Sequence, residues 1–373
     1  MLTPQTPAPE ILPPGSAAPG AVPPGPTGGR ALATVETVAG ITPVPGADAI
    51  ERARVRGWDV VVRAGELAAG DLCLYLEADS FLDVADPRFE FLAARGLRTR
   101  GDGVRGHVLT TGRLHGRYSQ GLALPVGLFP EAEGLAPGTD VTRRLGVVAW
   151  EPPLPAALAG EVLGPRPPWI PVTGVARLQN VPEILGARDL GWIATEKIDG
   201  ASSTFYVDGV QDTAGVCGRN GDLVESEENI LWQMARGHWL LERIAQEWPG
   251  RRVALHGEVF GEGIRANPLR VLGRHLALFG VHVDGADLPR ARWPRWVLEL
   301  SVPVRDDLTF PESVEQSLAE ADHLGSAIGI CRPAEGVVWR AADAAARVRL
   351  PGGAERRAAF TVVSNGYLLR HDR

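Results

Sequence analysis

The segment Thr195-Glu196-Lys197-Ile198-Asp199-Gly200 contains the only lysine in a chain of 373 residues, in which lysine and arginine together number 38. Arginine stays protonated at any working pH, whereas a lysine can lose its proton in a suitable site and become a nucleophilic amine. A codon bias toward arginine would explain the composition, and it makes the one retained lysine informative. The plainer alternative is a strand-end lysine paired with Asp199. We interpret Lys197 as a nucleophile that bonds covalently to phosphorus.

Four later segments place polar or aromatic side chains at strand ends or inside apolar runs. Arg219, in a polar turn, is either a surface hairpin residue or a ligand of ribose or phosphate. Glu258 lies between glycines in an apolar strand, so its carboxylate needs a partner: a salt bridge, a sugar hydroxyl or a metal-bound water. Phe279 is either a residue of the hydrophobic core or an aromatic face on which a purine base stacks. Glu335 is a candidate metal ligand, because Mg²⁺ takes carboxylate and water oxygens beside phosphate oxygens.

Hydrophobic patterning and turn residues divide the chain into parts. The proline-rich residues 1–29 read as a disordered tail. Residues 30–150 hold short β-rich runs at 33–38, 58–63, 71–76 and 107–111 and one helix at 86–95, which suggests a small β-barrel. Residues 151–168 read as a linker. Residues 169–373 predict an α+β unit with a large antiparallel sheet, with strands at 193–197, 203–207, 253–259, 276–282 and 336–340 and helices at 226–248 and 311–324.

Bulk composition limits the possible classes of protein. No apolar run approaches the roughly 20 residues of a membrane span, and the N-terminus does not resemble a signal peptide. The widely spaced Cys73, Cys217 and Cys331 argue against disulfides or zinc and predict a cytoplasmic protein. A net charge of −7 counts mildly against nucleic-acid binding, but phosphate contacts need only a local positive face. Two arginine clusters offer one: Arg95, Arg98, Arg100, Arg105, Arg113 and Arg117; and Arg347, Arg349, Arg356 and Arg357.

The order of the motifs resembles a known family. EKIDG (196–200), HGEVFG (256–261), FGV (279–281) and EGVVW (335–339) follow one another as in the covalent nucleotidyltransferases, which include ATP-dependent ligases and RNA capping enzymes. PGADAIERARVRGWDVVV (45–62), GDLCLYLEADSFL (70–82), PRFEFL (87–92), YSQGLALP (118–125), RLQNVPEIL (177–185) and FTVVSNGYLLR (360–370) resemble the Deinococcus-type RNA ligases. The resemblance covers about residues 31–373. It implies an α+β protein with an N-terminal OB-type β-barrel (30–150), followed by a nucleotidyltransferase domain (169–373), ATP-grasp-like, with antiparallel sheets.

The resemblance also implies an activity and its site residues. Lys197 would attack the α-phosphate of ATP and form lysyl-AMP, AMP would pass to an RNA 5′-phosphate, and a 3′-hydroxyl would complete the joint. The cofactors would be ATP with Mg²⁺ or Mn²⁺, and the partner an RNA or an RNA-containing duplex with a nick. By the same resemblance, Arg219 and Glu258 would bind the ribose, and Phe279 would stack on adenine. Glu335 and Glu258 would form the metal environment. Asp199 would support the ribose, the lysine or the water shell of the metal, and Glu196 and Gly200 would belong to the same nucleotide-binding element.

One position departs from the family pattern. Such enzymes usually carry a lysine before the V-x-S-N element to contact the α-phosphate, and here that position is Thr361. Arg356, Arg357 or Arg370 would then take over, because guanidinium binds phosphate well. Lysyl-AMP formation needs a neutral amine, so we expect the site to depress the pKa of Lys197 through desolvation or nearby positive charge, which a divalent cation can supply.

Three alternatives remain open at this point. A nucleic-acid-binding protein that kept the fold and lost turnover would account for Thr361. A capping-type guanylyltransferase or a DNA ligase would share the lysine motif, but these enzymes usually carry an OB domain after the last motif. The chain ends at Arg373, eight residues beyond Asn365, and the β-rich part lies in front, which favours an RNA ligase.

Overall fold

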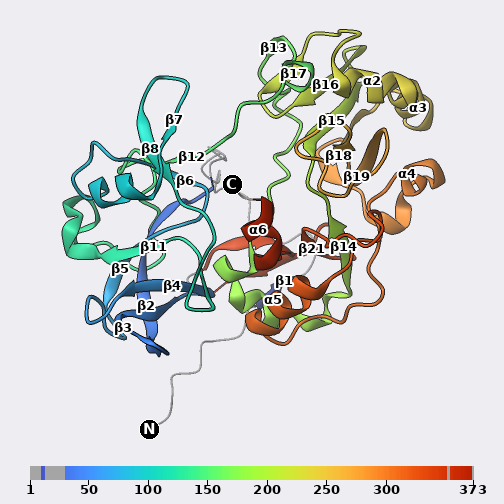
Figure 1. Ribbon diagram of the computed structural model, residues 1–373. Coiled ribbons are helices and arrows are strands. Elements are labelled where there is room, and N and C mark those ends of the chain that lie inside the picture. Colours follow the sequence, from blue (N-terminus) through green and yellow to red (C-terminus); the bar gives the residue numbers. More distant parts are fainter. Residues whose placement is uncertain (1–9, 13–29, 351–352, 372–373) are drawn as a thin grey trace. The chain divides into compact units, whose positions relative to one another are not determined.

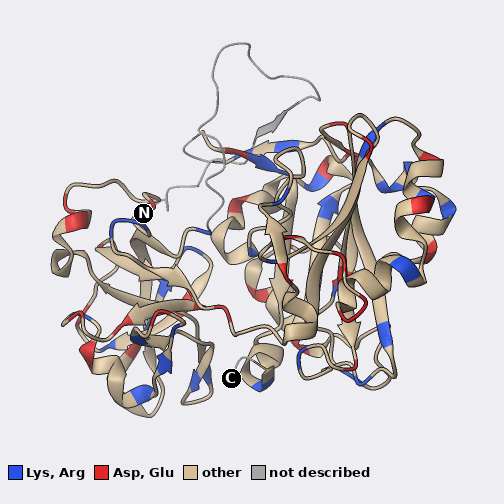
Figure 2. Ribbon diagram, turned by 90° about the horizontal axis from the view of Figure 1, so that it is seen from above, with Lys and Arg blue, Asp and Glu red and all other residues tan. Residues whose placement is uncertain are grey.

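The computed structural model describes residues 10–12, 30–350 and 353–371, and these fold into two compact units (Figure 1). The N-terminal unit comprises residues 30–152 together with two short later segments, 179–182 and 365–371. The C-terminal unit comprises residues 10–12, 153–178 and 183–364. Basic and acidic residues are interleaved in both units, so neither carries charge of a single sign (Figure 2).

The N-terminal unit is built on a curled antiparallel sheet with strand order β11-β5-β2-β3-β4. Its strands are β2 (Ala33–Val44), β3 (Ala47–Val55), β4 (Trp58–Arg63), β5 (Leu72–Leu76) and β11 (Leu122–Pro125). In β4 every second side chain is buried, as expected for a strand with one face on a core. Trp58 is fully buried on that face and stacks on Tyr75 at 5.9 Å between ring centroids.

The two outer strands of this sheet, β4 and β11, lie close together without a shared ladder. The chain just before β11 bonds to β4 instead: Val61 N–H donates to Ser119 Oγ at 2.9 Å, and Gln120 N–H donates to the Asp59 carbonyl at 2.9 Å. The sheet is therefore rolled into a half-barrel whose seam lies between β4 and β11.

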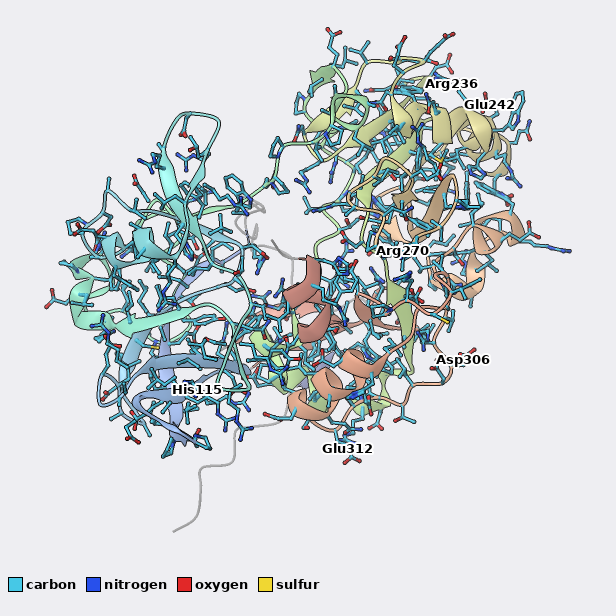
Figure 3. All side chains as sticks on the ribbon, viewed as in Figure 1. His115, Arg236, Glu242, Arg270, Asp306 and Glu312 are labelled. Atoms are coloured by element: carbon cyan, nitrogen blue, oxygen red, sulfur yellow. The ribbon has the colours of Figure 1, made fainter. Side chains whose placement is uncertain are left out.

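Smaller elements complete the N-terminal unit. A four-stranded sheet has the order β12-β6-β8-β7, and β9 pairs with β10 in a hairpin. These strands are β6 (Ser80–Asp83), β7 (Arg98–Thr99), β8 (Arg105–Val108), β9 (Gly112–Leu114), β10 (Arg117–Ser119) and β12 (Val148–Ala149). The helices are the 3₁₀-helices η1 (Glu90–Arg95), η2 (Val126–Leu128) and η3 (Pro130–Ala132), and α6 (Asn365–His371). His115, in the β9–β10 turn, is labelled in Figure 3.

A seven-stranded antiparallel sheet dominates the C-terminal unit, with the order β13-β17-β16-β15-β18-β19-β20. Its strands are β13 (Val162–Gly164), β15 (Ala201–Asp208), β16 (Thr213–Gly218), β17 (Gly221–Leu223), β18 (Arg252–Gly261), β19 (Arg274–Val283) and β20 (Ala286–Asp287). The largest core of the unit forms where α2 (Ile230–Gly237), α3 (Leu240–Glu247) and α4 (Arg295–Glu299) contribute buried side chains to this sheet. Arg236 and Glu242, labelled in Figure 3, lie on α2 and α3.

Two three-stranded antiparallel sheets lie in the same unit. One has the order β14-β21-β24, from β14 (Trp192–Lys197), β21 (Gly336–Ala341) and β24 (Ala359–Val363), and α5 (Val314–His323) packs on β21 and β24. The other joins β1 (Glu10–Leu12), β22 (Arg347–Arg349) and β23 (Glu355–Arg357). Its remaining helices are α1 (Ala156–Ala159) and the 3₁₀-helices η5 (Pro182–Gly186), η6 (Arg188–Leu190) and η7 (Arg290–Arg292), while most of η4 (Leu178–Asn180) falls in the segment 179–182 of the N-terminal unit.

The register of β14-β21-β24 divides its side chains between two faces. Trp192, Trp339 and Phe360 stack on one face with Phe310, where ring centroids lie 4.9–6.3 Å apart. Lys197 belongs to the other face, because side chains alternate along a strand. The aromatic core of one face thus supports a polar site on the other.

Two predicted helices differ in the structure. Residues 226–248 form two helices, α2 and α3, because Trp239 between them takes a left-handed conformation with φ 53°. The Asn229 side chain caps α2 by accepting from the N–H groups of Leu231 and Trp232. At 86–95 only the 3₁₀-helix η1 forms, since the Asp86 carboxylate accepts the Arg88 N–H and holds the chain in a turn.

The linker and tail also differ from the expectation. Within residues 151–168 the strand β13 pairs with β17, so this stretch contributes to the seven-stranded sheet. Within the predicted disordered tail, Glu10–Leu12 forms β1 against β22. The rest of that tail lies outside the described residues.

Candidate active site

Lys197 ends β14 and meets Glu335, the residue just before β21. Its Nζ donates to Glu335 Oε1 at 2.6 Å, and the side chains are 31% and 13% exposed. The pairing of Lys197 with Gly336 in the ladder explains the contact, since it brings the ends of the two strands together. A cationic amine thus lies at the rim of the sheet, bonded to a mostly buried carboxylate.

Gly200 brings a second carboxylate to the same place. Its N–H donates to Glu258 Oε1 at 3.1 Å, where the chain turns from β14 toward β15. A Cβ at position 200 would lie 2.3 Å from the Val259 carbonyl oxygen, far inside contact distance. Only glycine permits this close approach of the two backbones, which explains why the motif has glycine at position 200.

The Gly200→Ala variant will lose stability because the new methyl group collides with the backbone of β18. We expect the free energy of unfolding to fall by about 1–3 kcal/mol, as for overpacking in a core. Urea unfolding measures this change. Gly237→Ala is the matched control, because a Cβ there meets nothing within 4 Å. Equal stability of the two variants would contradict the steric account.

The charges around Lys197 determine its protonation. Burial alone would lower the pKa of Lys197, but the carboxylates of Glu335, Glu258 and Asp199 raise it above the usual value. For the protein's own groups, negative charge therefore outweighs desolvation. The predicted depression of this pKa by a divalent cation stays a prediction. Burial raises the pKa of Glu258 to about 8 and also raises the pKa of Glu335, both against the opposing charge of Lys197.

The same carboxylates suit a divalent cation that shares its ligands with a substrate. Glu335 Oε2 is buried and has no hydrogen-bond partner in the structure. Within the described ranges, no three acidic, histidine or cysteine side chains are close enough to hold a metal ion by themselves. Mg²⁺ commonly binds through one or two carboxylates plus water and phosphate oxygens. The residues present therefore fit a metal that arrives with a nucleotide.

Arg265 is a member of the site that the sequence analysis missed. Its Nε lies 3.5 Å from Asp199 Oδ1 and donates to the Gly200 carbonyl at 3.2 Å. It lies in the loop between β18 and β19, where Arg270 is labelled in Figure 3, and it takes a left-handed φ of 50°. The two glycines before it in Gly261-Glu262-Gly263 signalled a tight turn, but nothing in the sequence showed where that turn leads.

Phe279 lies beside the motif turn through an irregularity in its strand. The β18–β19 register shifts so that His256 pairs with Gly280 and Gly257 with Leu278, which leaves Phe279 as the extra residue of a β-bulge. The bulge packs Phe279 against a cluster that contains Ile198. His256 stacks on its ring at 6.5 Å, and Arg340 Cζ lies 5.7 Å from its centroid.

Three predicted ligands are not among the contacts described above. The carboxylate of Glu196 faces away from Lys197 and accepts from Ser326 Oγ and from the Ala327 N–H at 2.7 Å. Arg219 is half-buried in the turn between β16 and β17, and β16 and β15 separate this turn from β18 in the sheet. Arg370 is exposed on α6, in the N-terminal unit.

A cavity of about 660 Å³ opens at the half-barrel seam of the N-terminal unit. Its walls are mainly apolar, and they include Phe91 and Leu128, which are 41% and 50% exposed. Arg63 and Arg95 also line it. An apolar pocket with guanidinium groups is suited to a ligand that combines flat rings with negative charge.

Comparisons with known proteins agree with this architecture. Residues 32–126 match a family described as an OB-fold domain, and residues 191–353 match the RNA ligase family. A mutant of Naegleria gruberi RNA ligase, solved with AMP and Mn, is 35% identical, with 92% of this chain and 99% of that chain covered and a TM-score of 0.81. The structure of Naegleria gruberi RNA ligase with PPi is 36% identical, with 92% and 100% covered and a TM-score of 0.80. No curated protein matches the chain.

An OB-fold module followed by a nucleotidyltransferase domain defines the class as a nucleic-acid ligase. The chain belongs to the ATP-dependent RNA ligase family, and it is an enzyme of that type. The predicted α+β fold, with an OB-type barrel ahead of a nucleotidyltransferase domain, is confirmed.

No helix among the described residues is both long and apolar enough to cross a membrane.

Proposed function

We propose that this protein seals 3′-hydroxyl and 5′-phosphate ends of RNA through a covalent lysyl-AMP on Lys197. The observation that carries the proposal is the pairing of the chain's only lysine with Glu335 at 2.6 Å, beside Glu258 and Asp199. A nucleophilic amine amid carboxylates that can share a cation is the arrangement that phosphoryl transfer needs. The related Naegleria gruberi RNA ligase, solved with AMP and Mn and with ATP and Mn, supports the same cofactors here.

In the first step, adenylation of Lys197, one bond forms at the α-phosphorus and one breaks. The Lys197 nitrogen forms a bond to the α-phosphorus, the bond to the β-phosphate oxygen breaks, and pyrophosphate leaves with the electron pair. The ammonium must first lose a proton to water, and the surrounding carboxylates oppose this by raising the pKa of Lys197. Glu335 and Glu258 would hold a divalent cation, which when bound supplies positive charge at the α-phosphate and offsets these carboxylates.

The other site residues take roles that their positions allow. Phe279 has an aromatic face beside the motif turn, where an adenine would stack. Glu258 is within reach of the chain at Gly200, where a ribose would lie. Arg219 remains our proposed ribose ligand. Glu196 contributes indirectly, because its carboxylate accepts hydrogen bonds from Ser326 and Ala327 and so holds the loop that contains them.

A direct test detects the adenylyl group. The purified protein is incubated with ATP and Mg²⁺ or Mn²⁺, and intact-mass spectrometry should show one added AMP that maps to Lys197. A parallel incubation with GTP tests the alternative of a capping-type guanylyltransferase, which would transfer guanylate to the lysine instead. If no adduct forms on the incubated or the freshly isolated protein, the catalytically weakened binding protein becomes the better account.

The polynucleotide substrate we propose is a duplex with a nick and RNA on the 3′-hydroxyl side. Sealing assays on matched nicks should favour RNA at that side. An all-DNA nick sealed equally fast would overturn the RNA specificity.

We further propose that the seam cavity of the N-terminal unit takes part in RNA binding. Phe91 offers an exposed ring for a base, and the cavity also contains Arg63 and Arg95 for phosphates. Base stacking on an aromatic side chain contributes about 1–3 kcal/mol. We locate the enzyme in the cytoplasm, in keeping with the free thiols of Cys73, Cys217 and Cys331.

The Phe91→Ala variant will bind nicked RNA duplex about 10-fold more weakly, because one stacking surface is lost. Fluorescence anisotropy with a labelled nicked duplex measures the Kd. Leu72→Ala is the matched control, since Leu72 is 38% exposed in the same unit but does not line the cavity. Equal affinity of the two variants would remove the cavity from the RNA-binding surface.

A further inference from the structure

Among the described residues, Leu272 and Ile330 have the most exposed large apolar side chains, with 85% and 89% exposure. Leu272 lies in the loop between β18 and β19 (residues 262–273), and Ile330 lies in the loop before β21 (residues 325–334). We call these two segments the loop pair. A single exposed apolar side chain on a surface needs no explanation, but two on loops that touch indicate a surface that meets a partner.

The two loops pack against each other. Leu269 and Val271 of the first loop share a hydrophobic cluster with Ile328 of the second. Gly329 lies so close to Leu269 that a Cβ at position 329 would be 2.8 Å from the Leu269 carbonyl oxygen. Because the inner sides of the loops are joined, their exposed side chains belong to one surface.

The first loop holds a strained backbone. Arg265, Asn267 and Arg270 take left-handed φ values of 50°, 45° and 51°. The Asn267 side chain fastens the loop, since its Nδ2 donates to the Val271 carbonyl at 2.9 Å and its Oδ1 accepts from the Val271 N–H at 3.3 Å. Such conformations are costly for residues other than glycine, and they cluster at functional sites.

Both loops bond to residues that flank Lys197 in the chain. On one side, Arg265 Nε donates to the Gly200 carbonyl at 3.2 Å. On the other side, the Ala327 N–H donates to Glu196 Oε2 at 2.7 Å. The loop pair therefore lies beside the motif that carries the proposed nucleophile.

The loop pair is basic. It contains three arginines, Arg265, Arg270 and Arg332, and one acidic residue, Glu262. Arg270, labelled in Figure 3, is exposed. Arginines that bind phosphates and apolar side chains that contact bases are a combination found in proteins that bind duplex nucleic acid. The charge of the surface thus favours a nucleic acid as its partner.

We propose that the loop pair binds the RNA-containing duplex beside the nick, with Leu272 and Ile330 against bases and sugars at the break and Arg270 on a phosphate. This inference rests on the proposed function. One strand is interrupted at a nick, so the adjoining bases unstack at lower cost than in an intact duplex. Apolar side chains that enter between such bases fix the position of the break beside Lys197.

The shape of an RNA duplex permits this contact. Its minor groove is wide and shallow, and it displays base edges and 2′-hydroxyls. Side chains that project from short loops can therefore reach the bases without a helix entering the groove.

The experiment measures the Kd of two fluorescently labelled RNA duplexes by anisotropy, one intact and one with a nick. The nick ends in a 3′-deoxynucleotide, so that it cannot be sealed during the measurement. We compare wild type with Leu272→Ala, Ile330→Ala, the double variant Leu272→Ala/Ile330→Ala and Arg270→Ala.

Each kind of variant has a matched control. Val210→Ala is the control for the apolar variants, since Val210 is 67% exposed in the turn after β15, at the end of that strand opposite to Gly200. Arg188→Ala is the control for Arg270→Ala, since Arg188 is exposed. Thermal unfolding verifies the fold of every variant. Single-turnover sealing by protein already loaded with AMP gives a second readout, which starts after adenylation.

We expect Leu272→Ala and Ile330→Ala each to bind the nicked duplex about fivefold more weakly, and the double variant about 20-fold, because buried apolar surface is lost. Binding to the intact duplex should weaken by less than about threefold, since it offers no break. Arg270→Ala should reduce the slope of log Kd against log salt by about 1, whereas the double variant keeps the slope of wild type. Sealing of scarce nicks by the loaded double variant should slow in parallel with its loss of affinity.

Two results would overturn the proposal while wild type seals nicks and the variants fold. One is a double variant that binds and seals the nicked duplex as well as wild type, which would leave the loop pair to a protein partner. The other is an equal loss of affinity for the nicked and the intact duplex, which would place the contact away from the break. An unchanged salt slope in Arg270→Ala would overturn the phosphate contact. Failure of wild type to label or to seal would instead count against the proposed function.

Discussion

The Lys197→Arg variant will not form the covalent adduct with AMP, although it keeps the positive charge and can keep the ion pair with Glu335. Guanidinium does not deprotonate in proteins, so no nucleophilic nitrogen remains. We expect the rate of adenylation to fall by at least about 10⁴-fold, as when a nucleophile is removed from an active site. Labelling with radioactive α-phosphate and denaturing electrophoresis measures this loss.

The substitution is informative because this chain uses arginine wherever charge alone suffices. If position 197 served only to pair with Glu335, arginine would replace it without consequence. The reverse change, Arg188→Lys, is the matched control and should leave labelling unchanged, since Arg188 is exposed. Persistent labelling of Lys197→Arg would show that another residue is the nucleophile.

The Glu335→Gln variant will lose about 10²–10³-fold in adenylation at saturating Mg²⁺, because the amide cannot supply a negative oxygen to the cation or to the amine. Glu335 accepts from Lys197 Nζ at 2.6 Å through one oxygen, and its other oxygen is buried without a hydrogen-bond partner. Glu299→Gln is the matched control, since Glu299 is 58% exposed and pairs with Arg295.

The pH dependence of this variant gives a second readout that a merely structural role would not produce. The reactive form of Lys197 is the neutral amine, so labelling rises with pH below the pKa of that amine. Glu335 raises this pKa, so its removal lowers the pKa and enlarges the neutral fraction at a given pH. The rising limb of the profile should move to lower pH in Glu335→Gln. A move to higher pH would contradict the assigned electrostatics.

The sequence predicted the parts of the site that lie at strand ends. Lys197 stands out as the only lysine, Glu335 and Glu258 stand out as carboxylates beside glycine in apolar runs, and the structure places the three together. The strand predicted at 58–63 agrees with β4, because alternation of buried and exposed side chains is a local signal. The fold class was predictable from the order of such segments.

Non-local features were beyond sequence reasoning. Arg265 reaches the site through a loop turn whose partners are distant in the chain. The bulge at Phe279 depends on the register between two strands, which no single strand encodes. The effect of the protein's own groups on the pKa of Lys197 depends on how many carboxylates surround the amine, and this number appears only after folding.

The pairing of the sole lysine with Glu335 has a practical consequence for following this enzyme. Apart from the terminal amine, an acylating reagent finds one amino group in the whole protein. Held as an ammonium by its acidic neighbours, that group should react sluggishly until the balance of charge around it changes. Its rate of acylation can therefore report, without mutation or added dye, how each bound cation or nucleotide alters the readiness of the nucleophile.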